Sequence, residues 1–498
     1  MKKVSFLVIV SLLALAFFGC ARSESVSEAD YSAFTGTVSE VWEHSLMIDV
    51  TEGDILASSD CVIATFPEAI GIDAAVGDEV QVWYDGDIME SYPAQVNAVS
   101  YEIVQAGAAE EITVEGESAE AEIPRYYEEE SDTEDTGGDA AEESAAGDEV
   151  SAQAAELLAA MTLEEQIYQM FIVTPEQITG VSVATRAGSA TEEALQAYPV
   201  GGLVYFADNL VTREQCSEMI ANSQSYSKVG LFIAVDEEGG TVARIGSNSA
   251  MGTTSFPSMK TIGDSGDAEE ARNVGYTIGT EIRELGFNLD FAPVADIDSN
   301  PDNPVIGDRS FGTDAATVSE MVSAAVQGFQ ESGVLSTLKH FPGHGDTATD
   351  SHEGYTELNK TLEELWELEF VPFQSGIAAG ADFVMVGHIS VPQVTGDDVP
   401  ASLSGTMIDI LKNDLGFEGL VITDSMRMEA ITDRWSSAEA AVMAVQAGVD
   451  VILMPENLEE AVAGILDAAE SGEISEERIA RSVQKILETK IRAGIVSM

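Results

Sequence analysis

Side chains that can transfer protons are concentrated in one short stretch of this chain, residues 339–352. These fourteen residues, KHFPGHGDTATDSH, hold three of the chain's five histidines, one lysine and two aspartates. They directly follow residues 334–338, an apolar run typical of a strand. Loops after strands carry many binding and catalytic groups, and His, Asp and Lys are common general acids and bases. We therefore expect a proton-transferring loop that is positioned by the end of a strand.

The elements that position this loop are predicted from an alternation of strand and helix patterns over residues 151–498. Helical patterns such as 268–285, 315–331 and 437–447 separate most of the apolar runs. The eight apolar runs are residues 171–173, 202–206, 231–235, 289–294, 335–338, 383–386, 420–422 and 449–454. Alternating strands and helices predict parallel pairing with right-handed crossovers, and eight strands in this length predict an α/β fold of the (β/α)8 barrel type. An open doubly wound sheet is disfavoured because the sequence has neither a GxGxxG turn nor a P-loop.

Polar side chains follow the ends of most of these runs. They are Asp236, Glu237, Glu238 and Arg244 after the third run, Asp296 and Arg309 after the fourth, Lys339 and His340 at the fifth, His388 after the sixth and Asp424 after the seventh. Since the carboxyl ends of barrel strands converge, we expect these side chains to surround one pocket. The spacing of the Cys and His residues does not match a metal site, so we expect no metal or other cofactor. A pocket rich in Asp, Arg, Lys and His favours a polyhydroxylated ligand such as a sugar.

Five motifs occur in order along the predicted barrel: VDEEGGTVARI, NLDFAPVADI, GDRSFG, LKHFPGHGDTATDSH and GLVITDSMRMEAI. With them, residues 151–498 resemble glycoside hydrolase family 3, specifically its bacterial β-N-acetylglucosaminidases. The resemblance implies an exo-acting, retaining enzyme that releases terminal β-linked N-acetylglucosamine from peptidoglycan fragments or chitin-type oligosaccharides.

The resemblance also implies roles for individual residues. Asp424 would be the nucleophile that forms a covalent glycosyl-enzyme, and His352 would be the general acid/base with Asp350 as its partner. The positions that hold the hydroxyls of the terminal sugar would be Asp236, Arg244, Arg309, Lys339 and His340. A histidine can donate and accept a proton near neutral pH because its unperturbed pKa is about 6.5. Asp350, two residues away, can accept a hydrogen bond from the imidazole and fix its tautomer.

Other polar residues of these motifs have alternative interpretations. His344 lies between two glycines, and we expect it to brace the loop rather than bind substrate. His388 either lines the pocket or supports residues that do. Glu238 is interpreted as a residue that shapes a turn, and Asp296 either braces its loop or contacts sugar.

Two alternative functions fit the same residues. A histidine acid/base leaves the pocket less anionic than a glutamate would, so phosphate could replace water and the protein would be a β-N-acetylglucosaminide phosphorylase. The other alternative is a non-catalytic lipoprotein that binds cell-wall glycans.

Residues 1–20 have the pattern of a lipoprotein-type signal peptide. Lys2 and Lys3 precede an apolar run over 4–18, which is short for a spanning helix, and Gly19-Cys20 follows. Since this ending resembles a bacterial lipobox, we expect Cys20 to be lipidated and the protein to be anchored to the outer face of the cell membrane. Secretion or an uncleaved signal anchor is the alternative.

Two further segments lie between the signal and the barrel. Residues 31–105 contain short strand patterns separated by turn residues, which predict a small β-barrel or sandwich. Residues 106–150 contain seventeen acidic residues and one basic residue, Arg125, which predicts a disordered acidic linker. The whole chain has a net charge of −66, which disfavours nucleic acid as a partner.

Overall fold

The computed structural model describes residues 32–41, 45–53, 61–66, 72, 74, 78–89, 94–105, 139–349, 351 and 354–496. The chain divides into two compact units, Met1–Glu115 and Gly116–Met498. The predicted signal peptide with Cys20, most of the predicted acidic linker, and the predicted dyad of Asp350 and His352 lie outside the described residues.

The first unit contains a five-stranded closed barrel in the order β1-β2-β3-β5-β4. Its strands are β1 (Ser32–Val41), β2 (Ser45–Gly53), β3 (Cys61–Thr65), β4 (Glu79–Met89) and β5 (Ala94–Gln105). β3 and β5 pair in parallel, and the other pairs are antiparallel. Side chains alternate between the two faces of a strand, which places residues such as Phe34, Ile48 and Val82 in a buried core.

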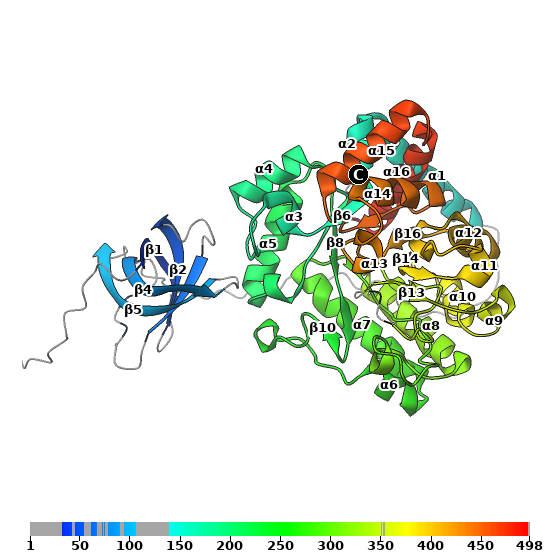
Figure 1. The fold of residues 1–498 in the computed structure, drawn as a ribbon, viewed down its shortest axis with the longest axis horizontal. Coiled ribbons are helices and arrows are strands. Elements are labelled where there is room, and N and C mark those ends of the chain that lie inside the picture. Colours follow the sequence, from blue (N-terminus) through cyan, green and yellow to red (C-terminus); the bar gives the residue numbers. More distant parts are fainter. Residues whose placement is uncertain are drawn as a thin grey trace, which may run out of the picture. The chain divides into compact units, whose positions relative to one another are not determined.

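The second unit is built on eight parallel strands that follow one another in chain order around a ring (Figure 1). They are β6 (Phe171–Val173), β7 (Gly202–Val204), β8 (Phe232–Val235), β11 (Leu289–Asp290), β12 (Thr337–Phe341), β14 (Phe383–Val386), β16 (Leu420–Thr423) and β17 (Ile452–Leu453). Two sheets, β17-β6-β7-β8-β11 and β12-β14-β16, are joined by bridges at Leu289–Leu335, Val294–Lys339 and Ile422–Val451. Each predicted apolar run thus contains or overlaps one strand, and the parallel α/β architecture is confirmed.

Helices follow most strands and cover the outside of this ring (Figure 1). They are α1 (Asp139–Ala159), α2 (Leu163–Gln169), α3 (Pro175–Thr179), α4 (Ser189–Ala197), α5 (Arg213–Tyr226), α6 (Met259–Ser265), α7 (Ala268–Leu285), α8 (Ala315–Ser332), α9 (Leu362–Glu367), α10 (Phe370–Ala378), α11 (Pro392–Thr395), α12 (Gly405–Asp409), α13 (Glu429–Thr432), α14 (Ser437–Ala447), α15 (Leu458–Ser471) and α16 (Glu476–Arg492). α7 illustrates why they form. Asp267 caps its first turn, and Val274, Ile278 and Ile282 form one buried stripe at helical spacing.

Helix α1 corrects the predicted boundary between linker and barrel unit. The helix begins at Asp139, so the last part of the predicted disordered segment is helical. Ala and Glu are strong helix formers, and the acidic composition concealed this preference. The helix also docks, because Ala154 is fully buried and the Gln484 side chain of α16 donates a hydrogen bond to the Ser151 carbonyl at 2.9 Å.

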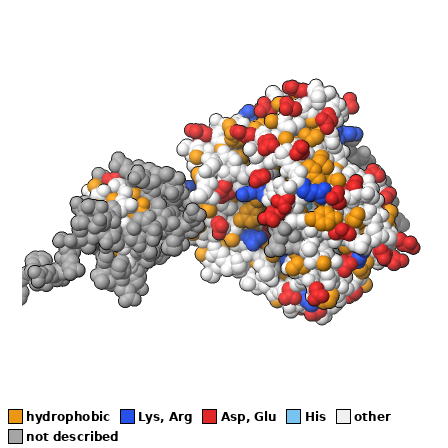
Figure 2. Space-filling view, in the orientation of Figure 1, with side chains coloured by type: hydrophobic (Ala, Val, Ile, Leu, Met, Phe, Trp, Pro, Cys, Tyr) orange, Lys and Arg blue, Asp and Glu red, His pale blue; other side chains and the backbone are white. Residues whose placement is uncertain are grey.

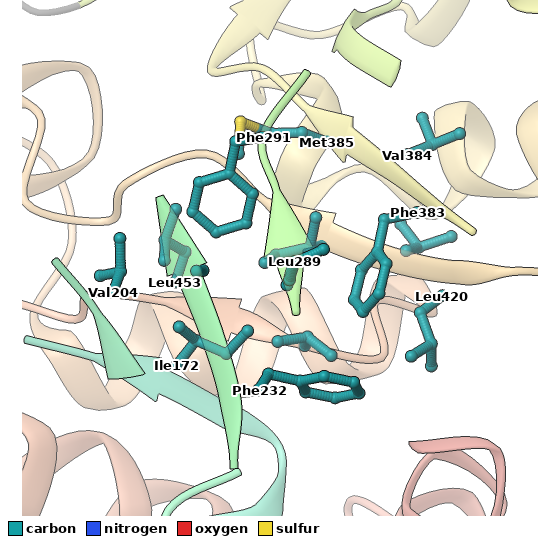
Figure 3. Close-up of a cluster of buried hydrophobic side chains, with 14 of the residues drawn as sticks. Ile172, Val204, Phe232, Leu289, Phe291, Phe383, Val384, Met385, Leu420 and Leu453 are labelled. Atoms are coloured by element: carbon teal, nitrogen blue, oxygen red, sulfur yellow. The ribbon is translucent and has the colours of Figure 1, made fainter. Parts of the chain in front are cut away.

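The interior of the eight-stranded ring is an apolar core (Figure 3). The Phe232 and Phe383 rings pack edge to face, with their centroids 5.4 Å apart. Phe291, Met385 and Leu453, which are labelled in Figure 3, also line a cavity. The core therefore ends where the polar site begins.

Acidic side chains are spread over the face of the second unit in Figure 2, and Lys and Arg side chains are fewer. Among the residues that the structure describes, no helix has the length and apolar composition needed to cross a membrane. Cys216 is a buried free thiol.

Candidate active site

A cavity of about 530 Å³ opens at the carboxyl ends of the barrel strands. Six of the predicted site residues line it, namely Asp236, Arg244, Arg309, Lys339, His340 and Asp424. Glu238 and Arg427 also line it. The structure therefore brings together residues from four different strand ends, those of β8, β11, β12 and β16, as the barrel geometry predicts.

Lys339 is the centre of a charged network in the cavity wall. Its ammonium group is buried, with 2% of the side chain exposed, and lies 2.7 Å from Asp236 Oδ1 and 2.6 Å from Glu238 Oε1. Burial opposes the charged form of Lys339, but the carboxylates of Asp236 and Glu238 outweigh it and raise its pKa. Lys339 is therefore a fixed positive charge.

Glu238 links this lysine to Arg309. The Arg309 guanidinium donates two hydrogen bonds to Glu238, from Nη2 to Oε1 at 2.7 Å and from Nε to Oε2 at 2.9 Å. Burial raises the pKa of Glu238, but Lys339 and Arg309 overcome this and hold it at about 2. The interpretation of Glu238 as a turn residue missed this role. One signal was available: Asp236 and Glu238 are two residues apart, so they share one face of an extended segment.

Glu237 points away from this network and supports the segment that carries Arg244. β9 (Glu237–Gly239) pairs with β10 (Val242–Ala243), and the Glu237 carboxylate accepts hydrogen bonds from the backbone of Ile245 at 2.7 Å and Gly246 at 2.9 Å. Burial raises the pKa of Glu237 to about 7 against these donors. The Arg244 guanidinium lies 5.9 Å from the ring centroid of Phe206, within reach of a cation–π interaction.

Asp296 braces the start of the loop that follows β12. Its carboxylate lies 2.7 Å from His340 Nδ1 and accepts a hydrogen bond from the His344 backbone at 2.7 Å. Burial raises the pKa of Asp296, but His340 and His344 outweigh it, so the pKa is lowered. Asp296 is fully buried and does not line the cavity. Of its two interpretations, the bracing role is the one that the structure supports.

His344 holds the middle of the loop. Its Nδ1 lies 2.7 Å from Thr347 Oγ1, and its Nε2 lies 3.0 Å from Ser351 Oγ. Burial lowers the pKa of His344, which favours the neutral ring in these contacts. Ser351, the residue between Asp350 and His352, is buried. These contacts agree with the expectation that His344 braces the loop.

A second anchor lies beside the loop. Lys360 Nζ is 3.0 Å from Asp346 Oδ2 and also pairs with the buried carboxylate of Glu369. The loop also packs tightly at Gly345, where an added Cβ would lie 1.7 Å from the Ile297 carbonyl oxygen. The loop is thus held by charge at Asp346 and by close backbone packing at Gly345.

Asp424 lies one residue beyond the end of β16. Its backbone N–H donates to Val386 O at 2.9 Å, and its Oδ1 accepts from the Ser425 N–H at 2.7 Å. His388 supports the same turn, because its Nε2 donates to Ser425 O at 2.9 Å while its Nδ1 contacts Ser402 Oγ at 2.7 Å. His388 does not line the cavity, so of its two interpretations the supporting role fits.

The described residues contain no cluster of three or more His, Cys, Asp or Glu side chains arranged to hold a metal ion. The cavity lining instead combines buried, paired charges with the side chain of Asp424. Carboxylates and cations are paired at its base, and the Asp424 carboxylate is presented beside them.

Comparison with known proteins identifies the family. Residues 162–489 match the model of the glycosyl hydrolase family 3 N-terminal domain. Residues 73–105, in the first unit, match a family described only as a protein of unknown function, DUF3221.

Individual relatives agree with the family match. Beta-hexosaminidase A of Pseudoalteromonas piscicida is 35% identical over 338 residues, which cover 61% of this chain and 56% of that protein. Beta-hexosaminidase LpqI of Mycobacterium tuberculosis is 36% identical over 320 residues, which cover 62% of this chain and 80% of that protein. The structure of a family 3 beta-N-acetylglucosaminidase from Paenibacillus sp. str. FPU-7 superposes with a TM-score of 0.63 at 39% identity, covering 68% of this chain and 63% of that one. This chain therefore spans less than two thirds of the Pseudoalteromonas and Paenibacillus proteins. Because the family match covers nearly all of the eight-stranded unit, the chain belongs to glycosyl hydrolase family 3.

Proposed function

We propose that this protein is an exo-acting, retaining β-N-acetylglucosaminidase that removes terminal β-linked N-acetylglucosamine from peptidoglycan fragments or chitin-type oligosaccharides. The observation that carries the proposal is the position of Asp424, which lines the same cavity as the Lys339 network. The names of the relatives, beta-hexosaminidase and beta-N-acetylglucosaminidase, support the same activity.

The terminal sugar binds at the base of the cavity. Asp236, Arg309 and Lys339 already carry charges in fixed positions, so they can form charge-assisted hydrogen bonds to hydroxyls without reorganising. His340 and Arg244 complete this set of contacts. Phe291, Met385 and Leu453 line the same cavity and offer apolar surface against which a sugar ring face can pack.

The chemistry proceeds in two displacements. In the first, an Asp424 carboxylate oxygen attacks the anomeric carbon while the glycosidic C–O bond breaks and His352 gives its proton to the leaving oxygen. In the second, His352 takes a proton from water, the water oxygen bonds to the anomeric carbon, and the bond to Asp424 breaks. Asp350 holds the imidazole and stabilises its protonated form. The contacts of Asp346, His344 and Ser351 support this role, since they anchor the loop on both sides of Asp350.

The test uses 4-nitrophenyl N-acetyl-β-glucosaminide. Purified protein should release nitrophenol, and the first sugar product should have the β configuration by NMR. Asp424→Asn should lower kcat by at least about a thousandfold, because the nucleophile is lost. His352→Ala should slow natural disaccharides far more than the activated aryl glycoside, since nitrophenol needs little protonation. Equal losses on both substrates would remove His352 from the role of general acid.

The same assay separates the alternative functions. A phosphorylase would form sugar 1-phosphate when water competes with inorganic phosphate. A folded protein that binds chitobiose but cleaves neither substrate would be a glycan-binding lipoprotein.

We also propose that the protein is anchored to the outer face of the cell membrane through lipidated Cys20. The support is the Gly19-Cys20 ending of the apolar N-terminal run. In cells, Cys20→Ser should move the protein from the membrane fraction to the medium or the soluble fraction. Retention of this variant in the membrane would favour an uncleaved signal anchor.

A further inference from the structure

Arg427 differs from Arg309 and Lys339, the cations at the base of the cavity. It lies three residues after Asp424, lines the cavity and is exposed. Its backbone N–H contacts Ser425 Oγ at 3.4 Å, but its guanidinium forms no hydrogen bond or ion pair with any other residue that the structure describes, Asp424 included. Arg309 and Lys339, by contrast, are each held by carboxylates. The Arg427 guanidinium is therefore available to a ligand.

An unpaired guanidinium is unexpected in this chain, because its 88 acidic residues far outnumber its 22 basic residues. Arg434, which is also exposed, shows how a guanidinium on such an acidic surface is usually paired. Arg434 pairs with Asp398 at 3.1 Å and lies 4.4 Å from the ring centroid of Trp435. Arg427 has neither kind of partner among the described residues, so no ion pair with them compensates its charge.

Depth in the cavity indicates which part of a substrate meets Arg427. Lys339 is 2% exposed, so the network around it forms the closed end of the cavity. An exo-acting enzyme places the terminal sugar in the closed end, and the leaving group then extends past Asp424 toward the mouth. Because Arg427 lines the cavity and is exposed, we place it on that open side.

We propose that Arg427 forms an anion-binding subsite on the leaving-group side of Asp424, for an oxyanion such as a carboxylate on the leaving group or free inorganic phosphate. A guanidinium binds either anion through two parallel hydrogen bonds, which also orients it. The proposal rests on the proposed function and deepens it, because it makes Arg427 a residue that selects anionic over neutral leaving groups.

Two aryl glycosides test the carboxylate source. They are 4-nitrophenyl N-acetyl-β-glucosaminide and its 3-carboxy-4-nitrophenyl counterpart, which differ by one carboxylate on the leaving group. The quantity measured is the ratio of kcat/KM for the carboxylated over the neutral substrate. Arg427→Gln should lower this ratio about tenfold, the size of one partly exposed charge-assisted contact. Arg427→Lys should recover part of it, and salt should reduce the ratio in the wild type. The matched control Arg434→Gln should leave the ratio unchanged, because Arg434 does not line this cavity.

Added inorganic phosphate tests whether the oxyanion bound by Arg427 is free phosphate. If the subsite takes free phosphate, the wild type forms sugar 1-phosphate or is inhibited by phosphate, and Arg427→Gln weakens that response about tenfold. An unchanged substrate ratio together with an unchanged phosphate response in Arg427→Gln would overturn the proposal. Cleavage of neither substrate by the wild type would instead overturn the proposed function. Calorimetric binding of the carboxylated glycoside to the wild type and to Arg427→Gln would then decide the subsite, with equal affinities counting against it.

Discussion

Replacing Glu238 with Gln removes the carboxylate that joins Lys339 to Arg309 while keeping the size of the side chain. Glu238 is a buried anion with two cationic partners, at 2.6 and 2.7 Å. Removing one partner of a buried ionic network is costly because the remaining charges lose their compensation. We therefore expect Glu238→Gln to destabilise the barrel unit and to weaken binding of the terminal sugar.

The magnitude follows from the pKa. Glu238 is held at about 2, against an ordinary value of 4.5, and each unit of pKa corresponds to about 1.4 kcal/mol. The ionised carboxylate thus contributes about 3 kcal/mol to stability at pH 7. Because the pKa is lowered in the folded state, this contribution is present above pH 4.5 and is lost as the pH falls toward 2. At pH 3 about half of it should remain.

The assay is urea unfolding followed by tryptophan fluorescence at pH 7, 5 and 3. The wild type should exceed Glu238→Gln in free energy of unfolding by about 3 kcal/mol at pH 7, and the gap should shrink by about half at pH 3. Glu284→Gln is the matched control. It removes the carboxylate of a more exposed ion pair, Arg213–Glu284, and should cost less than about 1 kcal/mol. A gap for Glu238→Gln that is the same at all three pH values would refute the electrostatic reasoning and leave only packing as the cause.

Two further predictions concern the supports of the site, and a third concerns Lys490, a buried lysine in the core. Asp296→Asn should lower kcat/KM about a hundredfold with an unchanged circular dichroism spectrum, because the Asp296 carboxylate holds His340. Lys360→Met should lower the thermal midpoint by several degrees in a melting scan, since it leaves the Glu369 carboxylate buried and unpaired. Lys490→Met should raise the thermal midpoint at pH 7, because burial lowers the Lys490 pKa to about 7. This lowered pKa also means that wild-type stability should rise between pH 7 and 10, so the advantage of Lys490→Met should shrink over that range.

The contacts of Lys490 in the core reduce the destabilisation that burial of its ammonium group causes. Its Nζ donates to Gln169 Oε1 at 2.9 Å and lies 5.0 Å from the ring centroid of Phe232. Both contacts favour the ammonium form and offset part of the desolvation. An unchanged thermal midpoint for Lys490→Met at pH 7 would mean that these two contacts offset the whole cost of desolvating Lys490.

The order of elements in the second unit was predictable from sequence because it depends on local patterns. Each parallel strand contains or overlaps a short apolar run, and a local capping box of Thr162 and Glu165 begins α2. The approximate place of Asp424 and Lys339 was also predictable, because residues at the carboxyl ends of barrel strands must converge. The start of α1 was not, since its stability depends on docking against α16, which lies more than three hundred residues along the chain.

The sequence by itself placed Asp236, Arg309, Lys339 and Asp424 at strand ends around one site, and the tertiary structure decided which of these charges are paired and with what. Glu238 joins Arg309 across 71 residues, and Asp236 joins Lys339 across 103, so no local pattern could show that these four form one network. Arg427 is the exception among these cations. The sequence shows that it lies three residues after Asp424, but only the structure shows that it has no carboxylate partner among the described residues. Pairing of charges depends on three-dimensional separation and burial, because both set the strength of the interaction, and neither is encoded in spacing along the chain.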